Sequence, residues 1–289
     1  MIVIFGVLLV FAMVFGGYLA AGGKMAVIVK ALPYEIAIIG GAAAGAFIIG
    51  NDMSAVKQTF RDLGRAVKGP RWTPGDYRDL LCLLFELLRL ARQNPVELEE
   101  HIEAPQTSAV FTRYPRILAD AEAVDLVCDT LRSAGLNYDD PHQVEEVLEK
   151  RMEASLHRAL HSSHALQTLA DGLPALGIVA AVLGVIKTMG SIDQPPEILG
   201  KLIASALVGT FLGVFLAYGF VAPFAGRVKA VVEEDAHFYQ LIREVLVANL
   251  HDHPTSLCIE VGRQNTPGHI RPSYSELEEA LRNLRQEAA

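Results

Sequence analysis

The sequence predicts an all-α integral membrane protein with four transmembrane helices and a large cytoplasmic helical insert. Hydrophobic residues make up 51% of the 289 residues and charged residues only 20%, which is too apolar for a soluble chain of this length. The apolar residues are concentrated in four long runs, each near the roughly 20 residues that a helix needs to cross a bilayer. The remaining segments show helical periodicity and no alternating strand pattern.

The first apolar run, residues 1–23, contains no charged residue before Lys24 and predicts the first span. A cleaved signal peptide is the alternative, but such a peptide needs a basic start and a shorter apolar segment. The second run, residues 32–51, is free of charge between Glu35 and Asp52. We therefore expect Glu35 near a membrane interface.

The third run, residues 169–190, contains Pro174 and no carboxylate after Asp171. Its Lys187 falls late enough to extend its ammonium group towards the lipid headgroups. The fourth run, residues 202–226, is the longest uncharged stretch. An even number of spans places both chain termini on the same side of the membrane.

The orientation follows from the basic residues beside the runs, which gather on the cytoplasmic side of membrane proteins. The connection between the first two runs has only Lys24 and Lys30, whereas the segments after the second and fourth runs contain Lys57, Arg61, Arg65, Lys68, Arg71, Arg227 and Lys229. Both termini are therefore predicted to be cytoplasmic. The predicted domains are a transmembrane hairpin (1–51), a cytoplasmic insert (52–171), a second hairpin (172–226) and a cytoplasmic tail (227–289).

The cysteines and the net charge agree with this arrangement. Cys82, Cys128 and Cys258 all fall in predicted cytoplasmic segments, where thiols stay reduced, so we expect small core residues. The formal net charge is −8, and no basic block appears on the chain. Binding to nucleic acid is therefore not expected.

The insert and the tail are predicted to be helical. Thr73 or Asp76 is expected to cap a leucine-rich helix that ends near Asn94, because the residue before a proline is pushed out of the α region. A short acidic element follows, then a proline turn and a helix capped at Gly135. Two further helices are expected to continue without a break, one into the third run and one from the fourth run to near His253.

Two polar clusters raise the question of a metal site and of a docking surface. His157, His161 and His164 share one helix face and have the spacing of metal ligands, but a solvated polar face is the better interpretation, and we expect no metal site. His251 and His253 resemble a helix-ending turn. The insert also contains an acidic run: Glu97, Glu99, Glu100 and Glu103. Its pattern alone favours a solvated face over a docking surface.

Small residues and prolines mark the apolar runs. Two pairs of glycines four residues apart predict close contact between helices, one in the second run (Gly41 and Gly45) and one in the fourth (Gly209 and Gly213). Gly177 and Gly184 share a face of the third run. Pro174 and Pro223 occupy matching ends of the third and fourth runs, where each removes a helical hydrogen bond. They indicate a hinge, and ordinary kinks are the alternative.

The sequence lacks the residue sets that catalysis requires. It contains no hydrolytic triad, phosphate loop or cysteine ligand set, so we expect neither an enzyme nor a bound cofactor. The four runs, as bounded above, have no ionisable group at membrane depth, where a self-sufficient proton or ion pathway would place one. If ions cross the membrane here, a partner must supply the carboxylate.

Long ordered motifs carry a family resemblance. They are VFGGYLAAGG in the first run, IIGGAAAGAFIIGN in the second, YPRILADA in the insert, LPALGIVAAVLGV and LVGTFLGVFLAYGFVAP in the third and fourth, and RPSYSELEEALR in the tail. With these motifs the chain resembles the flagellar motor stator subunits of the MotA/TolQ/ExbB proton channel family.

The resemblance implies a homopentamer around two copies of MotB, whose transmembrane helix supplies the proton-binding aspartate. The complex would conduct protons across the bacterial inner membrane and turn the rotor. Pro174 and Pro223 match positions of conformational coupling. Ala181, Thr210 and Tyr218 match positions that line the ion path, and Ala181 stands where sodium-driven relatives carry a threonine, which favours protons.

The resemblance also implies a contact with the rotor protein FliG. A basic and an acidic residue of the insert engage charges on the rotor, and they correspond to Arg92 and Glu99. This reverses the interpretation of the acidic run as a merely solvated face. The spacing is one residue shorter than in the best-known pattern, and Pro95 lies within it.

Two alternatives remain. An energising subunit of a TonB or Tol system, similar to ExbB or TolQ, shares the chemistry of the third and fourth runs, but such subunits usually have three spans and an outside amino terminus. A structural bundle or a solute transporter would not need a MotB-like partner. A transporter would, however, need polar groups at membrane depth, and the runs have none.

Overall fold

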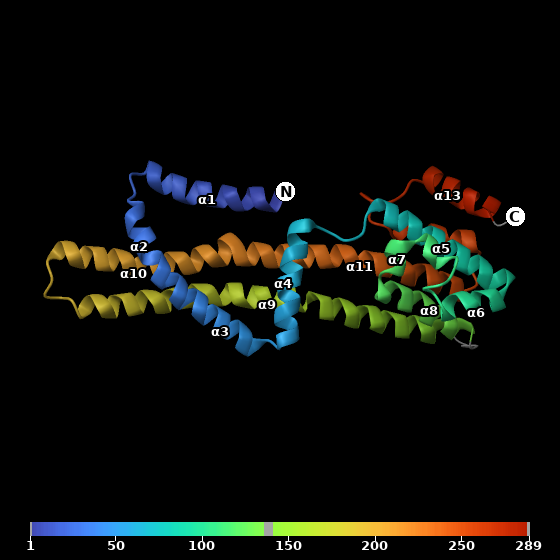
Figure 1. Ribbon diagram of the computed structural model, residues 1–289, viewed down its shortest axis with the longest axis horizontal. Helices are drawn as coiled ribbons and strands as arrows, with labels where there is room; N and C mark the ends of the chain where they lie inside the picture. Colours follow the sequence, from blue (N-terminus) through green and yellow to red (C-terminus); the bar gives the residue numbers. More distant parts are fainter. Residues whose placement is uncertain (1, 136–140, 288–289) are drawn as a thin grey trace. The chain divides into compact units, whose positions relative to one another are not determined.

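The computed structural model describes residues 2–135 and 141–287 (Figure 1). Every regular element in these ranges is a helix, which confirms the all-α fold class. The chain divides into two compact units. The membrane unit comprises residues 1–69 and 159–231, and the insert unit comprises residues 70–158 and 232–289.

The unit boundaries and the predicted domain boundaries describe different properties. The predicted boundaries mark where charged residues begin along the chain. The units reflect packing, and they differ because the basic segment after the second run forms helix α4 (Met53–Lys68) and packs within the membrane unit. In that unit the Arg227 guanidinium donates a hydrogen bond to the Ala66 carbonyl at 3.3 Å.

Four helical segments are long and apolar enough to cross a membrane, which confirms the predicted number of spans. The first is α1 (Ile2–Ala20). The second, Met25–Gly50, consists of α2 (Met25–Glu35), the π-helix η1 (Ile36–Gly40) and α3 (Gly41–Gly50). The third lies in α9 (Pro141–Met189), and the fourth segment, Pro196–Leu250, consists of α10 (Pro196–Leu216), the π-helix η3 (Ala217–Val221) and α11 (Ala222–Leu250).

The second span begins at Met25 and not at residue 32 as predicted. Pro33 lies inside α2, so one amide that would normally donate to the helix is missing. The Ile36 amide bonds to the carbonyls of both Leu32 and Pro33, and a π-helical turn follows. The wider turn lets the helix continue past the proline. Residues Lys30 and Glu35 are therefore inside this helix and not outside it.

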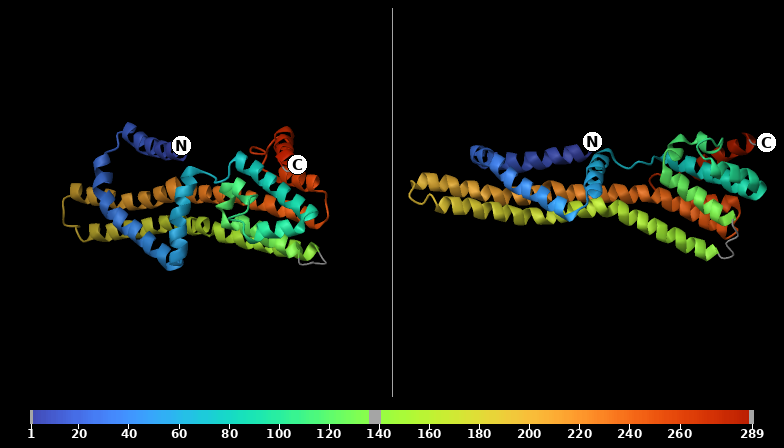
Figure 2. Two further views of the ribbon diagram at one scale, coloured as in Figure 1. Left: turned by 45° about the vertical axis from the view of Figure 1, so that its right-hand side comes forward. Right: turned by 60° about the horizontal axis from the view of Figure 1, so that its bottom comes forward.

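Helices α9 and α10 lie side by side in the membrane unit, as Figures 1 and 2 show. A Cβ added at Gly177 would lie 2.9 Å from the Gly209 carbonyl oxygen and 3.0 Å from the Gly213 Cα. A Cβ added at Gly184 would lie 2.6 Å from the Cβ of Ala206. The predicted close contact through these glycines is therefore confirmed.

The second glycine pair behaves differently. A Cβ added at Gly41 or at Gly45 would meet no atom of this chain within 4 Å. The predicted close contact through this pair is therefore not made with another helix of the described chain, and a contact with a partner chain stays a prediction. A small-residue spacing alone does not say which face of a helix is covered.

In the insert unit, α5 (Pro74–Gln93) is the central helix and packs against the elements around it. These are α6 (Pro95–Glu103), the 3-10 turn η2 (Phe111–Arg113), α7 (Pro115–Leu118), α8 (Ala121–Gly135), α12 (Thr255–Asn265), α13 (Tyr274–Glu287) and parts of α9 and α11. The predicted cap is a capping box, in which the Thr73 hydroxyl accepts from the Asp76 amide and the Asp76 carboxylate accepts from the Thr73 amide at 2.7 Å. Asn94 ends α5 and caps α6.

The core of the insert unit explains the apolar periodicity of its helices. Six leucines of α5 are fully buried: Leu80, Leu81, Leu83, Leu84, Leu87 and Leu88. The rings of Trp72 and Phe238 stack with centroids 3.8 Å apart. The three cysteines are buried free thiols, as predicted, and burial raises the pKa of Cys82 and Cys128 to about 12.

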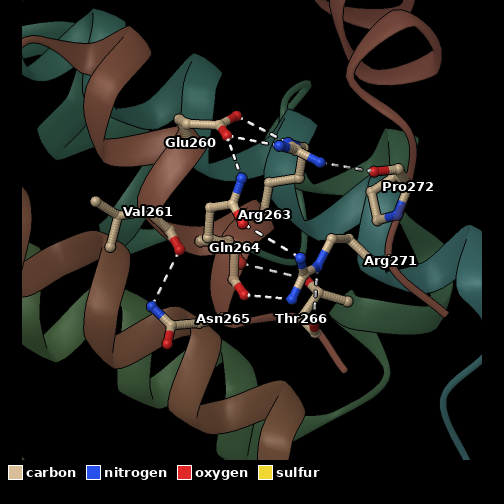
Figure 3. Close-up of polar contacts among 9 residues, drawn as sticks. Glu260, Val261, Arg263, Gln264, Asn265, Thr266, Arg271 and Pro272 are labelled. Atoms are coloured by element: carbon tan, nitrogen blue, oxygen red, sulfur yellow. Dashed lines mark hydrogen bonds and ion pairs between the residues drawn. The ribbon is translucent and has the colours of Figure 1, made fainter. Parts of the chain in front are cut away.

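Within the tail, a cluster of polar contacts joins the end of α12 to the segment that leads to α13 (Figure 3). The Glu260 carboxylate accepts two hydrogen bonds from the Arg263 guanidinium at 2.6 and 2.8 Å, and one from the Gln264 amide at 2.7 Å. Arg263 also donates to the Pro272 carbonyl, and Arg271 donates back to the carbonyls of Thr266 and Gln264. The contacts of Arg263 hold the pKa of Glu260 down at about 2.

Gly213→Ala is expected to destabilise the membrane unit, because the new Cβ would lie 2.7 Å from the Leu173 carbonyl oxygen and 2.8 Å from the Gly177 Cα. Backbone atoms must shift, and such overpacking costs about 1–3 kcal/mol. Gly200→Ala on the same helix is the control, because its Cβ would meet nothing within 4 Å. Thermal unfolding of the detergent-solubilised protein measures both, and equal stability of the two variants would contradict the contact.

Glu260→Gln is expected to lower the stability of the tail near neutral pH by about 1 kcal/mol, since it weakens charged hydrogen bonds at a partly exposed site. The folded-state pKa lies below the ordinary value of 4.5, so the stabilisation is present above that value and is lost as the pH falls towards 2. Hydrogen exchange of α12 and α13 at matched pH, with Glu279→Gln as an exposed control, measures the difference. A difference between wild type and variant that grows in acid would contradict this linkage.

Candidate functional site

The contact between α9 and α10 brings two of the predicted ion-path residues to one level. A Cβ at Gly209 would lie 3.2 Å from the Ala181 backbone nitrogen, and Thr210 is the next residue on α10. Both Ala181 and Thr210 are half-buried. Alanine offers no oxygen ligand at this point, whereas the Thr210 hydroxyl offers a donor and an acceptor.

Tyr218, the third predicted ion-path residue, lies in the π-helix η3, more than two helical turns beyond Thr210. Its side chain is 63% exposed in the single chain. Sequence reasoning did not predict the π-helix, because a π turn has no compositional signal of its own. The π turn ends at Val221, directly before the helical turn that contains Pro223.

The two prolines do not lie at matching depths, contrary to the prediction. In the antiparallel pair, Gly213 lies against Leu173 and Gly177, whereas the Ser163 hydroxyl donates to the Ala225 carbonyl at 3.0 Å. Pro174 is therefore level with Gly213, and Pro223 is about ten residues further along, an offset of about 15 Å. Hydropathy predicts where an apolar run ends, but it does not predict which residues of two neighbouring helices lie at the same level.

Pro174 lies within α9, which remains helical on both sides of it. A proline cannot donate to the carbonyl four residues earlier, so one helical hydrogen bond is missing there. Pro223 lies in the first turn of α11, where the preceding π turn accommodates its ring. The two prolines therefore weaken the helices at separate levels of the membrane unit.

Glu35 lies in the interior of the membrane unit and not at an interface as predicted. Its side chain is only 6% exposed, and a Cβ at Gly209 would lie 2.7 Å from its Oε2 atom. The prediction that the spans carry no ionisable group at membrane depth is therefore wrong. It failed because the second helix begins at Met25, which puts Glu35 at the end of α2 with η1 continuing beyond it.

The two predicted rotor-contact residues lie on successive helices of the insert unit, and both are exposed. Arg92, in the last turn of α5, donates to the His253 carbonyl and to the Asn249 side-chain oxygen. Glu99 lies in α6 and has no hydrogen bond or ion pair within the described part of the chain. Arg92 is thus held against the end of α11, whereas Glu99 is directed to solvent.

The described residues contain a different histidine cluster from the predicted one. His157, His161 and His164 are all exposed, whereas the neighbouring Ser162 and Ser163, which suggested a solvated face, are buried. His142, Glu145 and His251 instead bring potential ligand atoms within 4.8 Å of one another. An Arg243 nitrogen lies 3.5 Å from the same Glu145 carboxylate, and this positive charge disfavours a metal cation there.

Two family descriptions match the chain: Motility protein A N-terminal over residues 4–95, and the MotA/TolQ/ExbB proton channel family over residues 123–240. Motility protein A of Escherichia coli (strain K12) is 38% identical over 286 residues, which cover 99% of this chain and 96% of the relative. The Salmonella typhimurium protein of the same name is 39% identical over the same shares.

Solved structures show the same fold. The chain is similar to the structure titled C. jejuni MotAB, with a TM-score of 0.70 and 18% identity, over 94% of this chain and 98% of that one. It is also similar to the flagellar MotAB stator complex of Bacillus subtilis, with a TM-score of 0.67 and 22% identity, over 96% and 98%. At these identities the likeness concerns the fold alone.

The comparisons confirm the resemblance read from the sequence motifs. The match at the amino terminus and the full-length relatives favour a motor protein over an ExbB-like or TolQ-like subunit. The chain therefore belongs to the Motility protein A family, within the MotA/TolQ/ExbB proton channel family.

Proposed function

We propose that this chain is the stator subunit of a bacterial flagellar motor that, together with MotB, conducts protons across the inner membrane and turns the rotor. The full-length similarity to Motility protein A carries this proposal, because it extends over both the apolar helices and the insert. Four helices of membrane-spanning length support a multi-pass membrane protein. The basic residues beside them favour cytoplasmic termini.

The proposed assembly is a ring of five such chains around two copies of MotB, in contact with membrane lipid. The apolar faces of the spans support it, because many large side chains on α1, α3 and α9 are exposed in the single chain. Exposed apolar surface of this kind is covered by lipid or by other chains. MotB would supply the proton-binding aspartate, and the rotor partner would be FliG.

The chain is proposed to act without catalysis and without a bound cofactor, with protons as the conducted ion. Ala181 has no side-chain oxygen at a position beside Gly209 and Thr210, and a dehydrated sodium ion would need oxygen ligands there. The chain would act mechanically. Protonation of the partner's carboxyl group would change its contacts with α9 and α10, and the insert that contacts the rotor would move in response.

The insert would hold the rotor through weak charge contacts. Exposed ion pairs contribute about 0–1 kcal/mol each, so a few of them can form and break at every step. Arg92 is exposed yet fixed by the His253 carbonyl, which keeps its charge in one place. Glu99 provides the opposite charge one helix away.

Reversing both charges, as Arg92→Glu with Glu99→Lys, is expected to impair swimming several-fold while the complex still assembles. The control reverses an exposed ion pair at the start of the same helix, as Arg78→Glu with Asp79→Lys. Swimming speed and the yield of the complex are measured in a strain that lacks its own stator subunit. Normal motility of the Arg92 and Glu99 variant would count against these residues as the rotor contact.

Pro174→Leu is expected to abolish torque but not membrane insertion, because leucine restores the missing amide and stiffens α9 where flexibility is proposed. Pro196→Leu is the matched control, since Pro196 starts α10 at a position whose amide has no helical partner. Torque is measured on tethered cells at equal expression. Full torque in the Pro174 variant would exclude a bend at this residue as part of the mechanism.

A further inference from the structure

We propose that Glu35 is a proton-binding site inside the membrane unit, where it forms a second acid beside the ion path. The site goes beyond the carboxyl group that the partner would supply. Its proximity to the ion path rests on the function proposed above, whereas the binding of a proton by Glu35 does not. The argument depends on the burial of the side chain, on its missing partners and on the glycine against which it lies.

Glu35 belongs to a buried stripe along the second span. The other buried residues of this stripe are all apolar: Ile28, Ala31, Ile39 and Ala43. The spacing of three or four residues puts all five on one helix face. Part of this face packs with Val208 of α10. A side chain needed only for packing would be apolar at this position as well.

The carboxyl group lies against a gap in α10. Gly209 has no side chain, and a Cβ there would lie 2.7 Å from Glu35 Oε2 and 3.1 Å from the Ala180 Cβ. Any other residue at Gly209 would collide with the carboxyl group or displace it. The glycine therefore makes room for an acid at the point where α2, α9 and α10 meet.

Glu35 differs from the other buried acids of the described chain. Each of these accepts a hydrogen bond from a named donor: Asp62 from Gln58, Asp76 from Thr73, Glu86 from Tyr114, Asp120 from Ala123 and Asp235 from Arg71. The Oε2 atom of Glu35 is buried and has no hydrogen-bond partner among the described residues. Groups left in this condition are expensive to bury unless they are neutral.

Nearby charges do not compensate for an ionised Glu35. Along the three surrounding helices, the charged residues nearest to its level are all exposed, and none forms an ion pair with it in the described ranges: Lys30 on α2, Lys187 on α9, and Glu197 and Lys201 on α10. Placing a bare carboxylate among apolar helices in a bilayer is costly. A bound proton removes this cost and provides a hydroxyl donor.

The position of the acid gives the bound proton a role. A Cβ at Gly209 would also lie 3.2 Å from the Ala181 backbone nitrogen, and Thr210 is the next residue on α10. Glu35 thus lies at the same level as two of the proposed ion-path residues, Ala181 and Thr210. An acid there can receive a proton from a carrier that passes this level and return it, with no change in the number of protons overall.

The test compares wild type with Glu35→Gln, which keeps the shape of the side chain but cannot release a proton, in the purified complex with MotB. Infrared spectroscopy in H2O and D2O detects the carbonyl stretch of a protonated carboxyl group and its exchange. We expect a band that shifts in D2O and is missing in the variant. Glu197→Gln, an exposed acid on α10, is the control and should keep the band.

Motility separates this proposal from the proposed function. If the wild-type chain with MotB restores swimming to a strain lacking its own stator subunit, Glu35→Gln is expected to lower swimming speed several-fold at equal expression. Unchanged speed in the variant, or no band assignable to Glu35 in the wild type, overturns the proposal. Failure of the wild type to restore swimming would instead refute the stator function, and the infrared result would still decide whether Glu35 holds a proton.

Discussion

The membrane unit depends on the close backbone contact between α9 and α10. Apolar side chains gain little by leaving lipid for one another, so membrane helices are held together mainly by close packing of small residues. Gly177, Gly209 and Gly213 allow this packing because no side chain separates the two backbones. The contact also fixes the register of the helices, which sets Ala181 beside Gly209 and offsets the two prolines.

The same glycines determine where a polar group can be buried. Gly209 serves two purposes, since its missing side chain admits both the α9 backbone and the Glu35 carboxyl group. Polar atoms at this point lie between helices and not against lipid, which lowers the cost of their burial. A path for protons would need such a place, where an acid is accepted without a permanent counter-ion.

Most of the fold could be predicted because it depends on local signals. Composition and run length gave four spans, Thr73 and Asp76 identified the start of α5, and Asn94 marked its end. The early start of the second span and the π-helices were missed although they are local, and the other misses concern contacts between segments distant in sequence. Glu35 was assigned to an interface because the apolar run was taken to begin beside this charged residue. The helix itself begins ten residues earlier, at Met25. The partners of Arg92, which are Asn249 and His253, likewise have no local signal in the sequence.

The buried acids of the described chain are of two kinds, with and without a polar partner, and Glu35 is of the second kind. In the insert unit, the buried carboxylates Glu86 and Asp120 are paired with arginine and tyrosine. In the membrane unit, Asp62 is paired with Gln58 and Arg65. Glu35, in the membrane unit, lacks such a partner, so its charge depends on whether a proton is present. An unpaired buried acid changes its interactions with each proton gained or lost. A unit built to respond to protons needs the second kind.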